Sequence, residues 1–201
     1  KVLKAKYLKV NIFLKNLHKK EKIKLKNISI KKADIDLKFL DIENFYNHLK
    51  DNISKPIYIS NSNFFFRNDK KEITLISKIK KFAYFFDMQN KIKKLNIFGN
   101  LFGSEFIFKW EKNFSDPLIT TSDIKFKNPN LKIENKFDKK NENFIEAKTS
   151  INFLRNNLDL NYKFNQNNIE LIDDGNKIAN HSKLIGNINL NPFFFDLSLI
   201  L

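Results

Sequence analysis

Apolar and polar residues alternate along most of this chain, most clearly from Ile57 to Phe86, where two alternating runs flank the polar segment Asn68 to Lys71. Alternation of period two places one set of side chains on an apolar surface and the other in water. The pattern therefore predicts an antiparallel hairpin whose apolar side carries Ile57, Ile59, Phe64, Phe66, Ile73, Leu75, Ile79 and Phe85.

The same alternation recurs before and after this hairpin. Its phase slips near Asn27 and again near Lys31-Lys32, and each slip predicts a β-bulge or a strand end. Asn128-Pro129-Asn130 predicts a turn, and Asp174-Gly175 predicts a tight hairpin turn. Further alternating positions are Phe106, Phe108, Trp110, Ile124, Phe126, Leu131 and Ile133.

Together these runs predict an all-β, mainly antiparallel fold, an elongated curved sheet or groove of about a dozen short strands. The segment 41–50 is the exception, because Ile42, Phe45 and Leu49 follow helical spacing after a candidate N-cap at Asp41. We expect a single elongated region over residues 1–201, with a sub-boundary near 136–143. Because the chain starts at Lys1 and ends within an alternating run, we expect it to be a fragment of a longer protein.

The net charge of the chain bears on which partners it could bind. The net charge is +15, nearly all of it from lysine, with Arg67 and Arg155 as the only arginines. A basic surface is typical of proteins that bind nucleic acid or anionic lipid. We favour a compositional origin, in which an A/T-rich genome fills solvent positions with lysine and asparagine, because the lysines are dispersed and arginine is nearly absent. Phosphate readers usually use arginine for its bidentate fork. The chain has no cysteine, which excludes disulfides and thiolate metal sites.

Candidate catalytic and metal-binding residues are few. His18, His48 and His181 lack metal-ligand spacing, and no nucleophile elbow or glycine-rich phosphate loop is present. The carboxylate pairs Asp34 with Asp36 and Asp173 with Asp174 are expected on a solvent face and in a turn. We therefore predict a protein that is not an enzyme and that has no cofactor or metal.

Lysines interleave with aromatic residues from Lys80 to Phe86, as they do in single-strand nucleic-acid binders. Phenylalanine at period two is first of all typical of a core face, and we favour that interpretation. A sheet with one apolar face can cover it with a second sheet, by closing into a barrel, or with an apolar ligand. Phase slips and the lysine content disfavour a membrane barrel, which leaves a sandwich or a lipid-lined groove.

Four segments resemble the AsmA-like proteins of Gram-negative bacteria (the AsmA, TamB and YhdP type). They are Ile57 to Phe66, Phe106 to Trp110, Ile124 to Phe126 with Leu131 to Asn135, and Gly186 to Phe193. The likeness lies in a short helix before an I-x-I-x-N…F-x-F strand and in a G-x-I-x-L-x-P-F strand start, and it spans most of residues 23–201. Scarce glycine and high charge depart from the family's usual composition.

The resemblance implies a periplasmic β-groove whose full-length protein is anchored in the inner membrane. It also implies a role in phospholipid transport towards the outer membrane and in envelope integrity. Phospholipid acyl chains would then be the partner, held by the apolar alternating positions from Ile57 to Ile133 given above. Two alternatives remain, a structural or surface-adhesion β-sandwich without lipid and a basic nucleic-acid-binding module.

Overall fold

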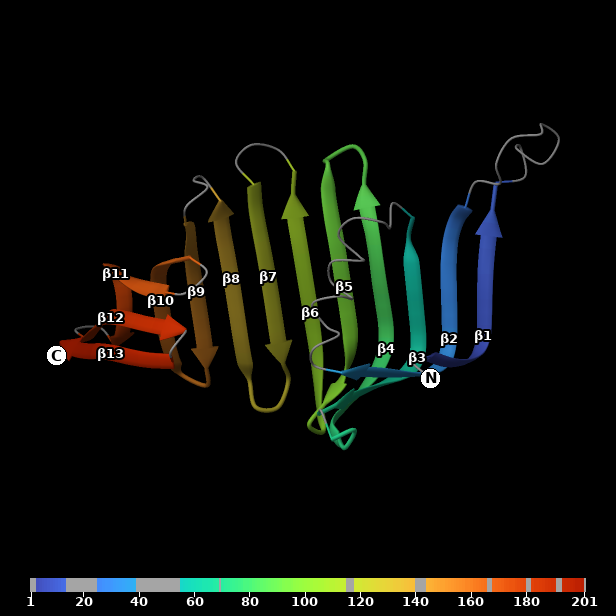
Figure 1. Cartoon of the computed structure of the whole chain (residues 1–201), viewed down its shortest axis with the longest axis horizontal. Helices are drawn as coiled ribbons and strands as arrows, with labels where there is room; N and C mark the ends of the chain where they lie inside the picture. Colours follow the sequence, from blue (N-terminus) through green and yellow to red (C-terminus); the bar gives the residue numbers. More distant parts are fainter. Residues whose placement is uncertain are drawn as a thin grey trace. The chain divides into compact units, whose positions relative to one another are not determined.

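The computed structural model describes residues 3–13, 25–38, 55–68, 70–114, 118–139, 144–165, 168–179, 182–190 and 193–200. It confirms the predicted all-β class, with thirteen strands hydrogen-bonded in sequence order in one open, mainly antiparallel sheet (Figure 1). The predicted helix near 41–50 lies outside the described residues.

The strands of the first half are β1 (Leu3–Ile12), β2 (Leu25–Lys38), β3 (Ile57–Arg67), β4 (Ile73–Asp87), β5 (Ile92–Leu101) and β6 (Ser104–Asn113). The strands of the second half are β7 (Leu118–Phe126), β8 (Leu131–Lys139), β9 (Ile145–Phe153), β10 (Asn156–Phe164), β11 (Asn168–Ala179), β12 (Ser182–Leu190) and β13 (Phe193–Ile200).

Two compact units share these strands. Unit 1 comprises residues 1–88 and 93–107, and unit 2 comprises residues 89–92 and 108–201. The boundary between the units runs through β6. The expected single region with a sub-boundary near 136–143 stays a prediction.

In unit 1, the pairing of β2 with β3 is parallel, with Ile30 opposite Ile59 and Ile35 opposite Phe64. This pair departs from the antiparallel pattern that the alternation predicts. A parallel pair needs a crossover of a dozen or more residues, and the chain between Lys38 and Ile57 is long enough to supply it.

A crease crosses the first four strands at Lys6, Lys32, Asn61 and Lys80. The pairing of β1 with β2 and of β3 with β4 stays in register past these positions, yet the buried side changes phase there, from Ile59 to Ser62 and from Ile79 to Phe82. Lys32 and Asn61 have positive φ, at 52° and 49°. Single left-handed residues change the direction of a strand, and Figure 1 shows these strands bending part-way along their length.

Neither of the predicted phase slips ends a strand. The slip near Lys31-Lys32 is the left-handed residue Lys32, and the slip near Asn27 coincides with a register shift between Asn11 and Ile12 on β1. Both lie inside or opposite β2, which continues through them from Leu25 to Lys38.

The core of unit 1 lies on one side of β2, β3, β4 and β6. Tyr84 is the most completely buried large side chain, at 1% exposed, and the Phe64 and Phe82 rings pack with centroids 6.3 Å apart. The other buried apolar residues are Ala33, Ile35, Leu37, Ile59, Ile79 and Phe106.

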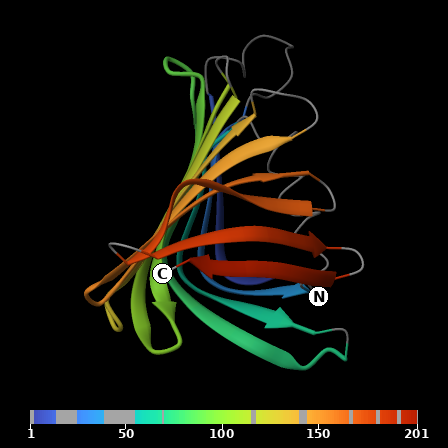
Figure 2. The same ribbon diagram turned by 90° about the vertical axis from the view of Figure 1, so that its left-hand side faces the viewer.

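Unit 2 is built from antiparallel neighbours joined by short turns. The predicted turn at Asn128-Pro129-Asn130 is confirmed, since β7 ends at Phe126 and β8 begins at Leu131. Figure 2 shows β11 to β13 side by side in orange and red.

The hairpin turn predicted at Asp174-Gly175 is wrong. Strand β11 runs through both residues to Ala179, and β12 begins only at Ser182. The pairing of β11 with both of its neighbours shifts register between Leu171 and Lys177. The Asp-Gly pair thus lies in an irregular, bulged part of the strand, another place where residues that tolerate unusual φ are favoured.

Candidate apolar binding face

One face of unit 2 carries rows of apolar side chains across β7 to β10, and we call it the apolar face. In the first row Ile124 pairs with Ile133, Ile133 with Ile151, and Ile151 with Leu158. A second row joins Phe126, Leu131 and Phe153. A third set extends over β8 to β11 and contains Phe137, Ala147, Tyr162, Phe164, Ile169 and Leu171.

Most side chains of these rows are only half-buried, unlike the core of unit 1. Ile124, Ile133, Ile151 and Leu158 all have intermediate exposure, and Phe153 is 41% exposed. The described strands thus present an extended apolar surface that is neither solvated like a polar face nor sealed like a core. Contiguous apolar surface of this kind marks interaction sites in soluble proteins.

Trp110, the only tryptophan of the chain, belongs to this face. Its β6 neighbours Lys109 and Glu111 line one concavity together with Thr121 and Asp123 of β7. Trp110 alternates with them and therefore points to the opposite side, with Phe108 and Ile124. Trp110 and Phe108 have intermediate exposure.

A hydrogen-bonded line of polar side chains, which we call the polar ladder, crosses the apolar face from β7 to β10 and ends at Tyr162 of the third set. Asn135 Nδ2 donates to Ser122 Oγ at 3.1 Å, and Thr149 Oγ1 donates to Asn135 Oδ1 at 2.7 Å. Thr149 Oγ1 also lies 3.1 Å from the hydroxyl of Tyr162. Thr149 is 8% exposed, while the other three members are half-buried.

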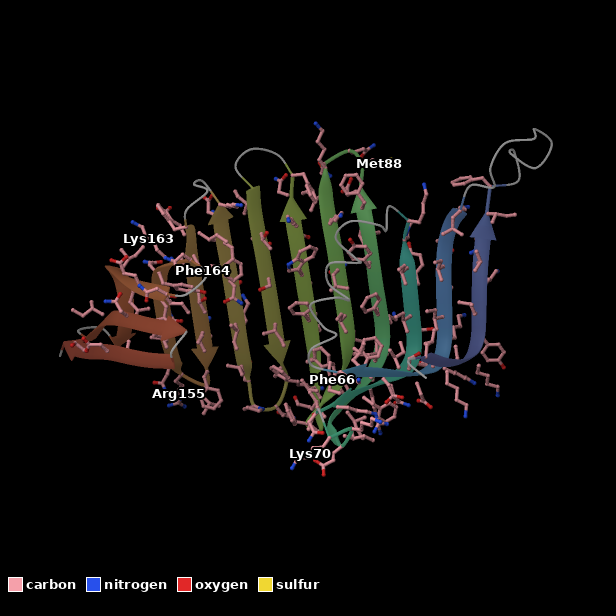
Figure 3. The ribbon with its side chains drawn as sticks, viewed as in Figure 1. Phe66, Lys70, Met88, Arg155, Lys163 and Phe164 are labelled. Atoms are coloured by element: carbon pink, nitrogen blue, oxygen red, sulfur yellow. The ribbon has the colours of Figure 1, made fainter. Side chains whose placement is uncertain are left out.

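The opposite face of unit 2 is polar and of mixed charge. It forms an open concavity of about 400 Å³, lined among others by Lys109, Asp123, Glu134, Lys136 and Lys148. Lys136 and Lys148 are direct cross-strand partners, an arrangement that is unfavourable for two like charges alone. Carboxylates flank this pair on both sides, at Glu134 and at Asp138 with Glu146. Figure 3 labels Lys163 and Phe164, consecutive residues of β10 that belong to the polar and the apolar face.

One pKa on the polar face is shifted. Lys132 Nζ lies 2.7 Å from a carboxylate oxygen of Glu134, and this hydrogen bond raises the pKa of Lys132 above 10.5. Desolvation lowers the pKa in part, and the negative charges of Glu134 and Asp123 raise it further.

The predicted groove residues of unit 1 are divided between a buried core and an exposed rim. Ile57, Ile59, Phe64, Phe66, Leu75 and Ile79 share one face, but Ile59, Phe64 and Ile79 are only 3–6% exposed. Ile73, at the β3–β4 hairpin, is 46% exposed. Figure 3 places Phe66 and Lys70 at this end of the hairpin.

Phe85 lies on the other side of β4 from the buried set. The change of phase at Lys80 turns Phe82 and Tyr84 inward, so that Tyr84 faces Ile57 across the strands and Phe85 alternates with it. Phe106 joins the core of unit 1, at 7% exposed. The remaining predicted positions, Phe108, Trp110, Ile124, Phe126, Leu131 and Ile133, all belong to unit 2 and to its apolar face.

The carboxylate pair Asp34 and Asp36 has structural partners. Asn63 Nδ2 donates to Asp34 at 2.8 Å, and Arg67 Nε donates to Asp36 at 2.6 Å. His18, His48 and His181 lie outside the described residues, as do the side chains of Asp173 and Asp174. Within the described part of the chain, no group of histidine, aspartate and glutamate residues could hold a metal ion.

A second concavity, of about 700 Å³, lies on β1 to β3 of unit 1 and is lined by Lys6, Tyr7, Leu8, Lys9, Asn11, Asn27, Ser29, Lys31 and Tyr58. Tyr7 is 52% exposed, and the ammonium groups of Lys6 and Lys32 lie 5.7 and 6.0 Å from its ring centroid. In the Lys80 to Phe86 segment, Phe82 and Tyr84 are buried and cannot stack on bases, whereas Phe85 and Phe86 are half-buried.

Two features were not predicted from the sequence. One is the contribution of β9 and β10 to the apolar face, and the other is the polar ladder. Alternation in both strands is visible in the sequence, but the position that faces Ile133 is decided by register. The ladder had a signal, since Ser122, Asn135 and Thr149 are polar residues at apolar-phase positions of three successive strands.

No protein-family model, curated protein or solved structure matches this chain. Among the residues that the structure describes, no helix is long and apolar enough to cross a membrane.

Proposed function

We propose that this chain binds phospholipid acyl chains on the apolar face of unit 2, as a piece of an AsmA-like periplasmic groove. In the full-length protein, anchored in the inner membrane, this face would pass phospholipid towards the outer membrane and so maintain envelope integrity. The proposed mechanism is passive and contains no catalytic step.

One observation carries the proposal. The apolar rows over β7 to β10 are half-exposed on a single sheet layer, so an apolar ligand can reach them. Each CH₂ group removed from water contributes about 0.8 kcal/mol, and an acyl chain therefore gains many kcal/mol on such a surface. The buried core of unit 1 supports folding instead.

The alternative of a β-sandwich is less well supported. A sandwich needs a second sheet against the apolar face, whereas all thirteen described strands belong to one sheet.

A nucleic-acid-binding role is the second candidate, favoured by the lysine and tyrosine concavity on β1 to β3. Exposed aromatic rings between lysines are the elements that single-stranded nucleic acid uses for stacking and charge neutralisation. Binding of labelled single-stranded DNA, lost on Tyr7→Ala and weakened by salt, would support it.

Native mass spectrometry of the purified chain, with identification of co-purified lipid, tests the proposal. We expect phospholipid adducts that are lost in Ile151→Asp, because a carboxylate in the first apolar row opposes acyl burial. Asn152→Asp is the matched control, since Asn152 is an exposed neighbour on the polar face. A lipid-free wild-type chain that also fails to take up added phospholipid would refute the proposal.

A further inference from the structure

The polar ladder is an unusual feature of a surface that otherwise suits hydrocarbon. Its four members come from four successive strands, β7 to β10. Ser122, Asn135 and Thr149 lie between the row of Ile124 and the set that contains Ala147, and Tyr162 belongs to that set as the cross-strand partner of Ala147. A polar group on an apolar surface is costly unless it is hydrogen-bonded. The four side chains form hydrogen bonds with one another, but these bonds do not use all of their protons.

The direction of its hydrogen bonds follows from counting protons. Thr149 has one hydroxyl proton and gives it to Asn135 Oδ1, so the hydroxyl of Tyr162 must donate to Thr149. At the other end, Asn135 donates one of its two amide protons to Ser122 Oγ. All bonds thus run from Tyr162 towards Ser122.

The common direction of these hydrogen bonds determines which protons of the ladder remain for a ligand. Within the four side chains, the protons not used in the ladder are the hydroxyl proton of Ser122 and the second amide proton of Asn135. Both are at the β7–β8 end, and both side chains are half-exposed there. The Tyr162 end has no proton left to give.

From this geometry we infer that the Ser122–Asn135 end of the ladder binds the ester carbonyl of a glycerolipid, whose acyl chain then lies along the neighbouring row of Ile124, Ile133 and Ile151. The carbonyl oxygen is a hydrogen-bond acceptor without a proton, which matches the end of the ladder where both unused protons lie. It also stands directly beside the hydrocarbon that the apolar row accepts. This inference rests on the proposed lipid binding and names the chemical group that is recognised.

Two lipids that differ only at their two ester carbonyls test the inference. A diacyl phosphatidylglycerol has ester carbonyls, while its dialkyl ether analogue has the same headgroup and chain lengths but no carbonyl. In native mass spectrometry of the wild-type chain with an equimolar mixture, we expect the ester lipid to be favoured by about twofold to tenfold, the range of one hydrogen bond.

Matched variants assign the preference to one end of the ladder. Ser122→Ala removes a donor that faces the ligand and should abolish most of the preference, whereas Tyr162→Phe removes a hydroxyl at the far end and should keep it. Both variants lose one hydroxyl group, and circular dichroism establishes that both are folded.

The possible outcomes distinguish a failure of the carbonyl site from a failure of acyl-chain binding. Equal binding of ester and ether lipids by the wild-type chain, or an unchanged preference in Ser122→Ala, would overturn the carbonyl site and leave acyl binding in place. A larger loss in Tyr162→Phe than in Ser122→Ala would also overturn it. Absence of binding of either lipid to the wild-type chain would refute both.

Discussion

At the scale of single residues, Phe82 shows how one ring joins the strands of unit 1. It lies opposite Ile59 across β3 and β4, packs against Phe64, and is only 4% exposed. Removing a buried aromatic ring loses its transfer free energy and leaves a cavity.

We therefore expect Phe82→Ala to lower the free energy of unfolding by about 3–5 kcal/mol. Phe102→Ala is the control, because Phe102 lies in the β5–β6 turn, is 81% exposed, and should change stability by no more than about 0.5 kcal/mol. Urea unfolding followed by circular dichroism measures both. Equal losses in the two variants would contradict the assignment of Phe82 to the core.

A second residue-scale prediction concerns Lys132, whose pKa is raised by its hydrogen bond to Glu134. A raised pKa in the folded state means that the stabilising effect of the charged lysine is complete below pH 10.5, the ordinary value, and is lost as the pH rises through the folded-state pKa. Near neutral pH the contribution of Lys132 is fully present, so its titration should not make stability vary with pH there.

NMR titration of the lysine side chains should place Lys132 above pH 10.5, and Glu134→Gln should lower its pKa towards that value. The exposed Lys125, its cross-strand partner, gives an internal comparison. A Lys132 pKa that does not respond to Glu134→Gln would show that the hydrogen bond does not form in solution.

At the scale of the element, the crease explains why alternation along β2, β3 and β4 is broken at consecutive polar residues. Lys31-Lys32, Ser60-Asn61 and Lys80-Lys81 each interrupt the apolar phase, and the three interruptions lie side by side in the sheet. Two of the central residues have positive φ, a conformation that costs a residue with a Cβ about 1–2 kcal/mol.

The adjacent lysines of β2 form a natural matched pair for this claim. At Lys32, glycine removes the left-handed penalty and offsets its own entropic cost, so Lys32→Gly should leave stability unchanged or raise it by up to about 1 kcal/mol. At Lys31, which has ordinary strand geometry, the same change should cost about 1 kcal/mol. Thermal unfolding compares them, and equal destabilisation would count against a left-handed Lys32.

The sequence predicts the strands better than their partners. The alternation of apolar and polar residues is visible among neighbours in the sequence. The polar segments Asn68 to Lys71 and Asn128 to Asn130 interrupt it, and they therefore indicate the β3–β4 hairpin and the β7–β8 turn. The parallel pairing of β2 with β3 depends on a crossover that leaves no mark in either strand. Asp174-Gly175 misled for a related reason, because the same pair suits a bulge as well as a turn.

At the scale of the whole molecule, the candidate site was predicted in part. Trp110, Ile124 and Ile133 could be assigned to an apolar face, but the separation of a sealed core in unit 1 from an accessible face in unit 2 depends on burial. Burial is set by how strands bend and pack, and the residue types are the same in both units. The resemblance to AsmA-like proteins stays a proposal.

The central claim is that the apolar face of unit 2 takes acyl chains, and Trp110 allows it to be tested at the site. Bromine on an acyl chain quenches tryptophan fluorescence only at close range, and no other tryptophan contributes. We predict that phosphatidylglycerol brominated along its acyl chains quenches Trp110, that the unbrominated lipid does not, and that Ile151→Asp abolishes the effect. Unquenched Trp110 fluorescence in a chain that native mass spectrometry shows to be loaded with the brominated lipid would place the lipid elsewhere and contradict the account.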